Sequence, residues 1–170
     1  MIRQLCREWC FFYHEYPSLP FVRDPASDGS IVRQTKQALL GKWSLTPLVP
    51  ALTQSERARA ELLERMRALA ETLCEDKRRY FEIFLQQQNE YFLHLTRWSL
   101  AVAALLSASC AEALSQSGSR AIAELDAILQ LRRTEAKGYW EHWYRGDGKI
   151  NVENLKERTL AAWEKRKEEM

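Results

Sequence analysis

The sequence predicts an all-α fold: a helical bundle of three long helices with additional shorter helices toward the N- and C-termini. No glycine or proline occurs from Ala51 to Ser117, a stretch of 67 residues. Because these two residues disfavour helix most strongly, such a stretch is typical of helical proteins. Apolar residues also recur at spacings of three and four, the period of one helix face. At 170 residues, the chain has the usual length of one domain.

We expect that domain to span residues 1–170, and it begins with a short helix over residues 1–16. Four apolar residues there share one face: Leu5, Trp9, Phe12 and Tyr16. Because this pattern already runs at Met1, we consider that the chain is the C-terminal part of a larger protein. Three prolines then predict a connector over residues 17–30.

Ser30 suits the N-cap of a second short helix, residues 31–40, which Gly41 ends. A second Pro-containing connector, residues 43–54, follows. It is rich in apolar residues, so we expect it to pack against the bundle.

Two helices of opposite character are predicted next. Half of the residues from 55 to 82 are charged, and Ser55 suits their N-cap. Only two charges occur from 83 to 111, so we expect this helix to be the buried central one. Residues 86–89 are predicted to form either a kink or a tight turn between two helices. A single helix of about 60 residues would be about 90 Å long, so we favour the turn and two antiparallel helices. The stripe of the first helix is Leu62, Met66, Leu69 and Leu73.

A turn at Ser117-Gly118-Ser119 is predicted to precede the third long helix, residues 119–144. Asn151 is a suitable N-cap for a last helix over residues 152–167, which is highly charged and is expected to cover the bundle from outside. The predicted core stripe of the third helix is Ile122, Leu125, Leu129, Ala136 and Trp140.

The charge balance and the apolar runs exclude several function classes. Lys and Arg total 25 against 23 Asp and Glu, so no one-sided basic surface for nucleic acid is expected. The longest uncharged run, residues 98–111, is shorter than the roughly 20 residues that span a bilayer. Charged residues interrupt the N-terminus, which argues against a signal peptide. We therefore expect a soluble chain, cytoplasmic by default, without a membrane partner.

Cysteine spacing offers one candidate metal site. Cys6, Cys10 and His14 are four residues apart and would share a helix face. A zinc site needs a fourth ligand and usually a tighter pair of cysteines. We therefore favour four reduced, buried thiols, with Cys74 and Cys110 completing the set, and expect neither metal nor cofactor.

The segment from Gly138 to Asn151, GYWEHWYRGDGKIN, is the main candidate for binding. Its Asp-Gly pair suggests a calcium loop. That alignment places Trp143, Arg145 and Asn154 at ligand positions where calcium needs carboxylates, so we reject it. The Arg-Gly-Asp tripeptide is too short to indicate an adhesion signal.

The same segment resembles segments near the C-terminal end of large bacterial glycoside-hydrolase-like proteins, where a helix ending in an aromatic-Arg-Gly-Asp turn follows the catalytic barrel. The resemblance implies an accessory domain, with other domains of the protein as partners and carbohydrate as a candidate ligand. The implied binding residues are Trp143, Tyr144, Arg145 and Asp147. Alternatively, Trp140 and Trp143 simply extend the core stripe. The chain has no strand–helix alternation for a barrel.

Two functions therefore remain. The favoured one is a non-catalytic helical module for protein interaction, with no catalytic residues of its own. The rival is a small helical enzyme with a polar site inside the bundle. Its candidates, Glu90, His94 and Arg97, follow the i, i+4, i+7 spacing of one helix face. A pocket with convergent polar groups would favour the enzyme.

Overall fold

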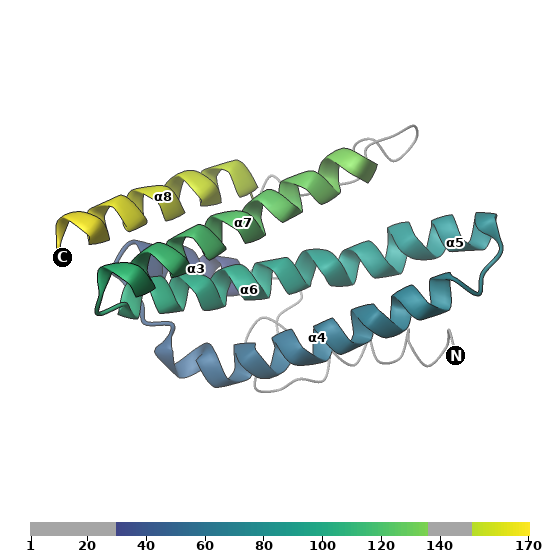
Figure 1. The fold of residues 1–170 in the computed structure, drawn as a ribbon, viewed down its shortest axis with the longest axis horizontal. Helices are drawn as coiled ribbons and strands as arrows, with labels where there is room; N and C mark the ends of the chain where they lie inside the picture. Colours follow the sequence, from purple (N-terminus) through teal and green to yellow (C-terminus); the bar gives the residue numbers. More distant parts are fainter. Residues whose placement is uncertain (1–29, 136–150) are drawn as a thin grey trace.

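A computed structural model describes residues 30–135 and 151–170, and all regular structure in these residues is helical (Figure 1). The predicted all-α class is confirmed for this part of the chain. The predicted first helix, most of the first connector and the end of the third long helix lie outside the described residues. The elements are α3 (Ser30–Leu39), the 3-10 turn η1 (Thr46–Leu48), α4 (Val49–Ala70), α5 (Glu75–Phe81), the π-helical turn η2 (Glu82–Gln86), α6 (Gln87–Ser107), α7 (Ala111–Glu135) and α8 (Val152–Glu168).

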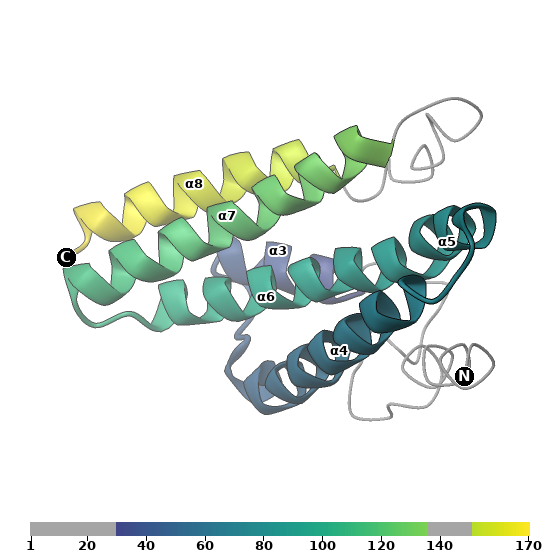
Figure 2. The ribbon, with the colours of Figure 1, turned by 45° about the vertical axis from the view of Figure 1, so that its right-hand side comes forward.

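Helix α6 is the centre of the fold. It contacts α3, α4, α7 and α8, and Figures 1 and 2 show it between α4 on one side and α7 on the other. Three of its side chains, Trp98, Val102 and Leu105, are fully buried. The scarcity of charge in its sequence is what permits neighbours on several sides. The prediction of a buried central helix is thus confirmed.

Two buried hydrogen bonds join α6 to its neighbours. The Trp98 indole N–H donates to the Thr159 hydroxyl of α8 over 3.1 Å, and the Thr35 hydroxyl of α3 donates to Ser99 over 3.0 Å. A buried indole N–H without an acceptor would lose its hydrogen bond to water. These bonds therefore fix where α3 and α8 lie along α6.

Helix α4 begins earlier than the sequence analysis predicted. It starts at Val49, with Pro50 in its first turn and no side-chain N-cap. Proline is tolerated there, because the first N–H groups of a helix have no intrahelical partner. Ser55 is therefore no cap but a fully buried residue inside the helix. The predicted connector over residues 43–54 is correspondingly shorter.

The favoured turn between two helices at residues 86–89 was also wrong. The chain turns after Ala70 instead, and the π-helical turn η2 carries α5 on into α6. Arg78 of α5 caps the C-terminal end of α4. Its guanidinium donates to the carbonyl of Ala70 over 2.9 Å and to that of Glu71 over 3.2 Å. These carbonyls have no partner within the helix, so an arginine closes the turn without glycine.

Helix α7 runs through Ser117-Gly118-Ser119, where a turn was predicted. The turn lies before it, between α6 and Ala111. A Cβ atom added at Gly118 would overlap the ring of Trp163, so glycine lets α8 approach α7 closely. The predicted core stripe is confirmed in part: Leu125 is fully buried and Leu129 packs against the core, whereas Ala136 and Trp140 lie outside the described residues. The other buried apolar residues of α7 are Leu114, Ala121 and Ile128.

Two helix ends agree with the sequence analysis. Helix α3 stops before Gly41, whose φ of 69° is the conformation that favours glycine. Asn151 caps α8: its side-chain oxygen accepts from the Asn154 N–H over 2.9 Å. The start of α8 was therefore predictable from its cap.

Gly118→Ala tests the close approach of α7 and α8. Alanine normally stabilises a helix interior by about 1 kcal/mol relative to glycine. Here the clash with Trp163 should cost about 2–3 kcal/mol, so thermal or urea unfolding should show a net loss of stability. The exposed neighbour Ser119→Ala is the control and should be neutral. In a Trp163→Ala background, Gly118→Ala should become stabilising; a loss there too would contradict this account.

Candidate functional site

The rival enzyme site does not come together in the structure. Glu90, His94 and Arg97 are half-buried on α6, but each pairs with a different residue on another helix. The pairs are Glu90 with Arg67 of α4 at 3.1 Å, Arg97 with Glu56 of α4 at 2.8 Å and His94 with Glu124 of α7 at 2.7 Å. The three side chains therefore act as separate links between helices.

The His94–Glu124 pair has part of the geometry of a catalytic base. A carboxylate hydrogen-bonded to an imidazole can orient it, and the Nδ1 of His94 lies 2.7 Å from Oε2 of Glu124. Catalysis would also need a nucleophile or a bound water at the ring. Within the described ranges, Glu124 is the one hydrogen-bond partner of His94, so the pair as it stands serves packing.

A buried arginine on α4 was missed by the sequence analysis. Arg59 is only 2% exposed, although it lies in the heavily charged segment of residues 55–82. Its guanidinium lies 5.3 Å from the ring centre of Phe92. The Asn89 amide donates to the Arg59 carbonyl over 2.9 Å. Helical spacing could have found it: Arg59 lies three residues before Leu62 and seven before Met66, so it shares the buried stripe of α4.

Tyr91 is a further buried polar residue of α6. Burial raises the pKa of its phenol to about 12, because water no longer stabilises the phenolate. The Arg132 guanidinium, 5.9 Å from the ring centre, opposes that shift. Tyr91 is therefore neutral at ordinary pH and is no candidate for a general base.

The predicted binding residues Trp143, Tyr144, Arg145 and Asp147 lie outside the described residues, as does Trp140. The same holds for Cys6, Cys10 and His14. Cys74 and Cys110 are free but exposed, which corrects the expectation that they are buried. Both precede helices, in the turns before α5 and α7, rather than on a packed face. In residues 30–135 and 151–170, no three His, Cys, Asp or Glu side chains gather in a way that could hold a metal ion.

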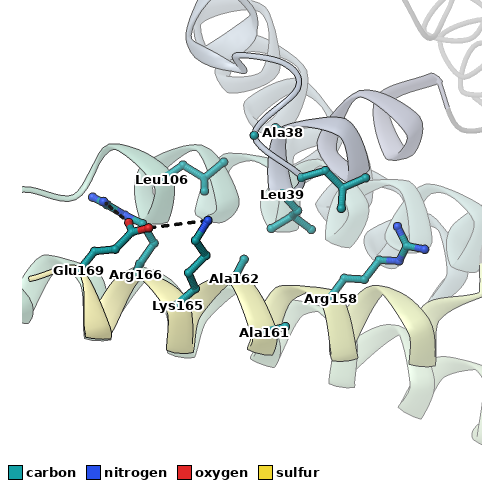
Figure 3. A pocket seen from close by; sticks show the side chains of 11 residues that line it. Ala38, Leu39, Leu106, Arg158, Ala161, Ala162, Lys165, Arg166 and Glu169 are labelled. Carbon is teal, nitrogen blue, oxygen red and sulfur yellow. Dashed lines mark hydrogen bonds and ion pairs between the residues drawn. The ribbon is translucent and has the colours of Figure 1, made fainter.

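A groove of about 450 Å³ lies between the end of α3 and the outer side of α8; we call it the α3–α8 groove (Figure 3). Leu106 of α6 also lines it, across from α8. The apolar part of its wall is completed by Ala38, Leu39, Leu40, Ala161 and Ala162. Leu40 is 51% exposed, so apolar surface here remains in contact with water.

Cations outnumber anions around the α3–α8 groove. Arg158, Lys165 and Arg166 line it together with one carboxylate, Glu169. Glu169 pairs with Arg166 at 3.0 Å and more distantly with Lys165 at 3.7 Å. Figure 3 shows Arg158 at the opposite end of the groove from these pairs.

None of the helices α3 to α8 combines the length and the apolar composition needed to cross a bilayer. No protein-family model, no curated protein and no solved structure matches this chain. The function is therefore inferred from the geometry.

Double-mutant cycles test whether the polar residues of α6 form one site. Arg97→Gln combined with Glu56→Gln should show a coupling of about 0.5–1 kcal/mol in urea unfolding, since the pair is partly shielded from water. Arg97→Gln combined with Glu90→Gln should show almost none, because seven residues place them about 10 Å apart along the helix. Equal coupling in both cycles would mean that a shared polar site exists.

Proposed function

We propose that this chain is a non-catalytic helical module that binds a protein partner through its outer surface. The observation that carries the proposal is the separation of Glu90, His94 and Arg97 into three pairs with other helices. An interior enzyme site would need these groups to converge on a substrate. Instead, the space around α6 is filled by packed side chains such as Trp98.

The α3–α8 groove supports the surface part of the proposal. It combines exposed apolar side chains with cations that outnumber the one lining carboxylate. Exposed apolar surface rimmed by polar groups is typical of sites for protein interaction. In this proposal the long helices α4, α6 and α7 form the rigid bundle, and α3 and α8 present the binding surface.

The finer proposal is that the module is a C-terminal accessory domain of a larger carbohydrate-active-type protein. Its support is the resemblance of residues 138–151 stated above. Under that proposal, other domains of the same protein are the partner, and the binding residues that the resemblance implies, Tyr144 and Arg145 among them, offer a second contact.

The rival proposal, a small helical enzyme, keeps one supporting observation. The half-buried His94–Glu124 pair would become a catalytic base if a ligand or water met the free ring nitrogen. The two proposals differ in what they predict for the purified protein.

Photo-cross-linking tests the module. A benzoylphenylalanine would replace, one at a time, Leu40, Trp43, Tyr80 or Leu160, which are exposed apolar residues. In the cells that produce the protein, at least one position should give a discrete adduct with another protein. The purified chain should hydrolyse neither chromogenic glycosides nor esters. Turnover that is lost in His94→Gln or Glu90→Gln, without any adduct, would overturn the module in favour of the enzyme.

A further inference from the structure

The outer face of α8 has a symmetric pattern at the α3–α8 groove. Arg158, Ala161, Ala162 and Lys165 follow the i, i+3, i+4, i+7 spacing, which places them on one face. All four line the groove, and Figure 3 shows the two alanines between the two cations. The face therefore has a low apolar centre of two methyl groups and a positive charge at each end.

The cation at one end of this face has no carboxylate to pair with. The Nε of Arg158 donates to the Asn154 side chain over 2.8 Å, and no ion pair in the described parts of the chain involves its guanidinium. Lys36 of α3 is close enough that Arg158 adds to the lowering of its pKa, which burial causes first. Among residues 30–135 and 151–170, no carboxylate forms an ion pair with either of these two like charges, which favours an anionic group at this end.

The cation at the other end is only weakly held. Lys165 lies 3.7 Å from Glu169, and its side chain is 76% exposed. Glu169 is closer to Arg166, at 3.0 Å. Lys165 can therefore turn to a carboxylate from outside at little cost.

We propose that the α3–α8 groove binds an acidic amphipathic α-helix of a partner protein, whose contact face reads Glu-x-x-Leu-Leu-x-x-Glu. This proposal rests on the interaction module argued above and names its partner. The two glutamates are seven residues apart, about 10 Å along a helix, which matches the spacing of Arg158 and Lys165. The two leucines between them meet the apolar centre of the face.

The length of the groove along α8 suits a helix of about three turns. Its lining residues on α8, from Arg158 to Glu169, extend over about 16 Å, or three helical turns. Alanines let two helices pack at the short end of the usual 8–10 Å separation. Recognition of an amphipathic helix through anchors at i, i+3, i+4 and i+7 is a common mode of binding.

The probe for this proposal is a synthetic, fluorescently labelled helical peptide of about 15 residues with the face Glu-x-x-Leu-Leu-x-x-Glu, stapled because short helices are marginal in water. Fluorescence anisotropy should show saturable binding to the full chain. Arg158→Glu/Lys165→Glu should weaken binding of this peptide at least tenfold. The same variant should bind a second peptide, with lysines in place of the glutamates, more tightly than the unchanged chain binds that second peptide. Arg158→Gln/Lys165→Gln is a milder second variant that should also weaken binding.

Two controls separate the groove from general attraction between opposite charges. Lys77→Glu/Arg79→Glu changes the net charge equally on exposed residues of α5 and should leave the affinity within about twofold, because charges farther away than about 10 Å are screened at 0.1 M salt. Ala161→Arg adds a cation but fills the groove, so it should weaken binding at least tenfold. Circular dichroism would confirm that each variant is folded.

Several results would overturn the proposal. The first is that the chain shows no saturable binding up to about 1 mM peptide. The second is that Lys77→Glu/Arg79→Glu weakens peptide binding as much as Arg158→Glu/Lys165→Glu does. The third is that Ala161→Arg binds the peptide more tightly than the unchanged chain does. Self-association of the chain that disappears in Arg158→Glu/Lys165→Glu would assign the groove to a second copy. Binding to phosphatidylglycerol vesicles in place of the peptide would assign it to lipid. A further result separates this proposal from the proposed function. If cross-linking at Tyr80 still captures a protein while the groove variants bind the peptide no more weakly than the unchanged chain does, the interaction module is supported and the acidic helix is the wrong partner.

Discussion

The burial of α6 is the constraint on which the other helices depend. Trp98 is fully buried, so its indole N–H needs an acceptor inside the protein, and Thr159 of α8 supplies it. Thr35 and Ser99 make the corresponding link to α3. A helix with so few charges cannot be left in water, so α3, α4, α7 and α8 must cover it.

Because packed side chains fill the space around α6, the surface of the bundle is where a binding site is expected. The polar side chains that α6 does carry are used to link it to α4 and α7. Helix α8 has its inner face occupied by Val152, Leu155 and Thr159, while its outer face remains open along the α3–α8 groove.

Some local signals in the sequence predicted local features correctly, whereas others, such as Ser55 as an N-cap, did not. Asn151 was recognised as a cap because the cap depends on its own neighbours. Gly118 was misread as a turn, because its purpose, space for the Trp163 ring, is set by a residue far along the chain. The turn after Ala70 was missed because Arg78 closes it with its side chain rather than with a glycine. The groove could not be predicted at all, since α3 meets α8 only in three dimensions.

The most direct test of the central role of α6 is native-state hydrogen exchange followed by NMR. The amides of α6 around Trp98 should exchange only through global unfolding, with the same free energy as urea denaturation gives. Amides of α5 and of the last turn of α8 should exchange faster through local opening. Exchange in α6 as fast as in α5 would contradict the account, because a helix that holds the others in place cannot open before they do.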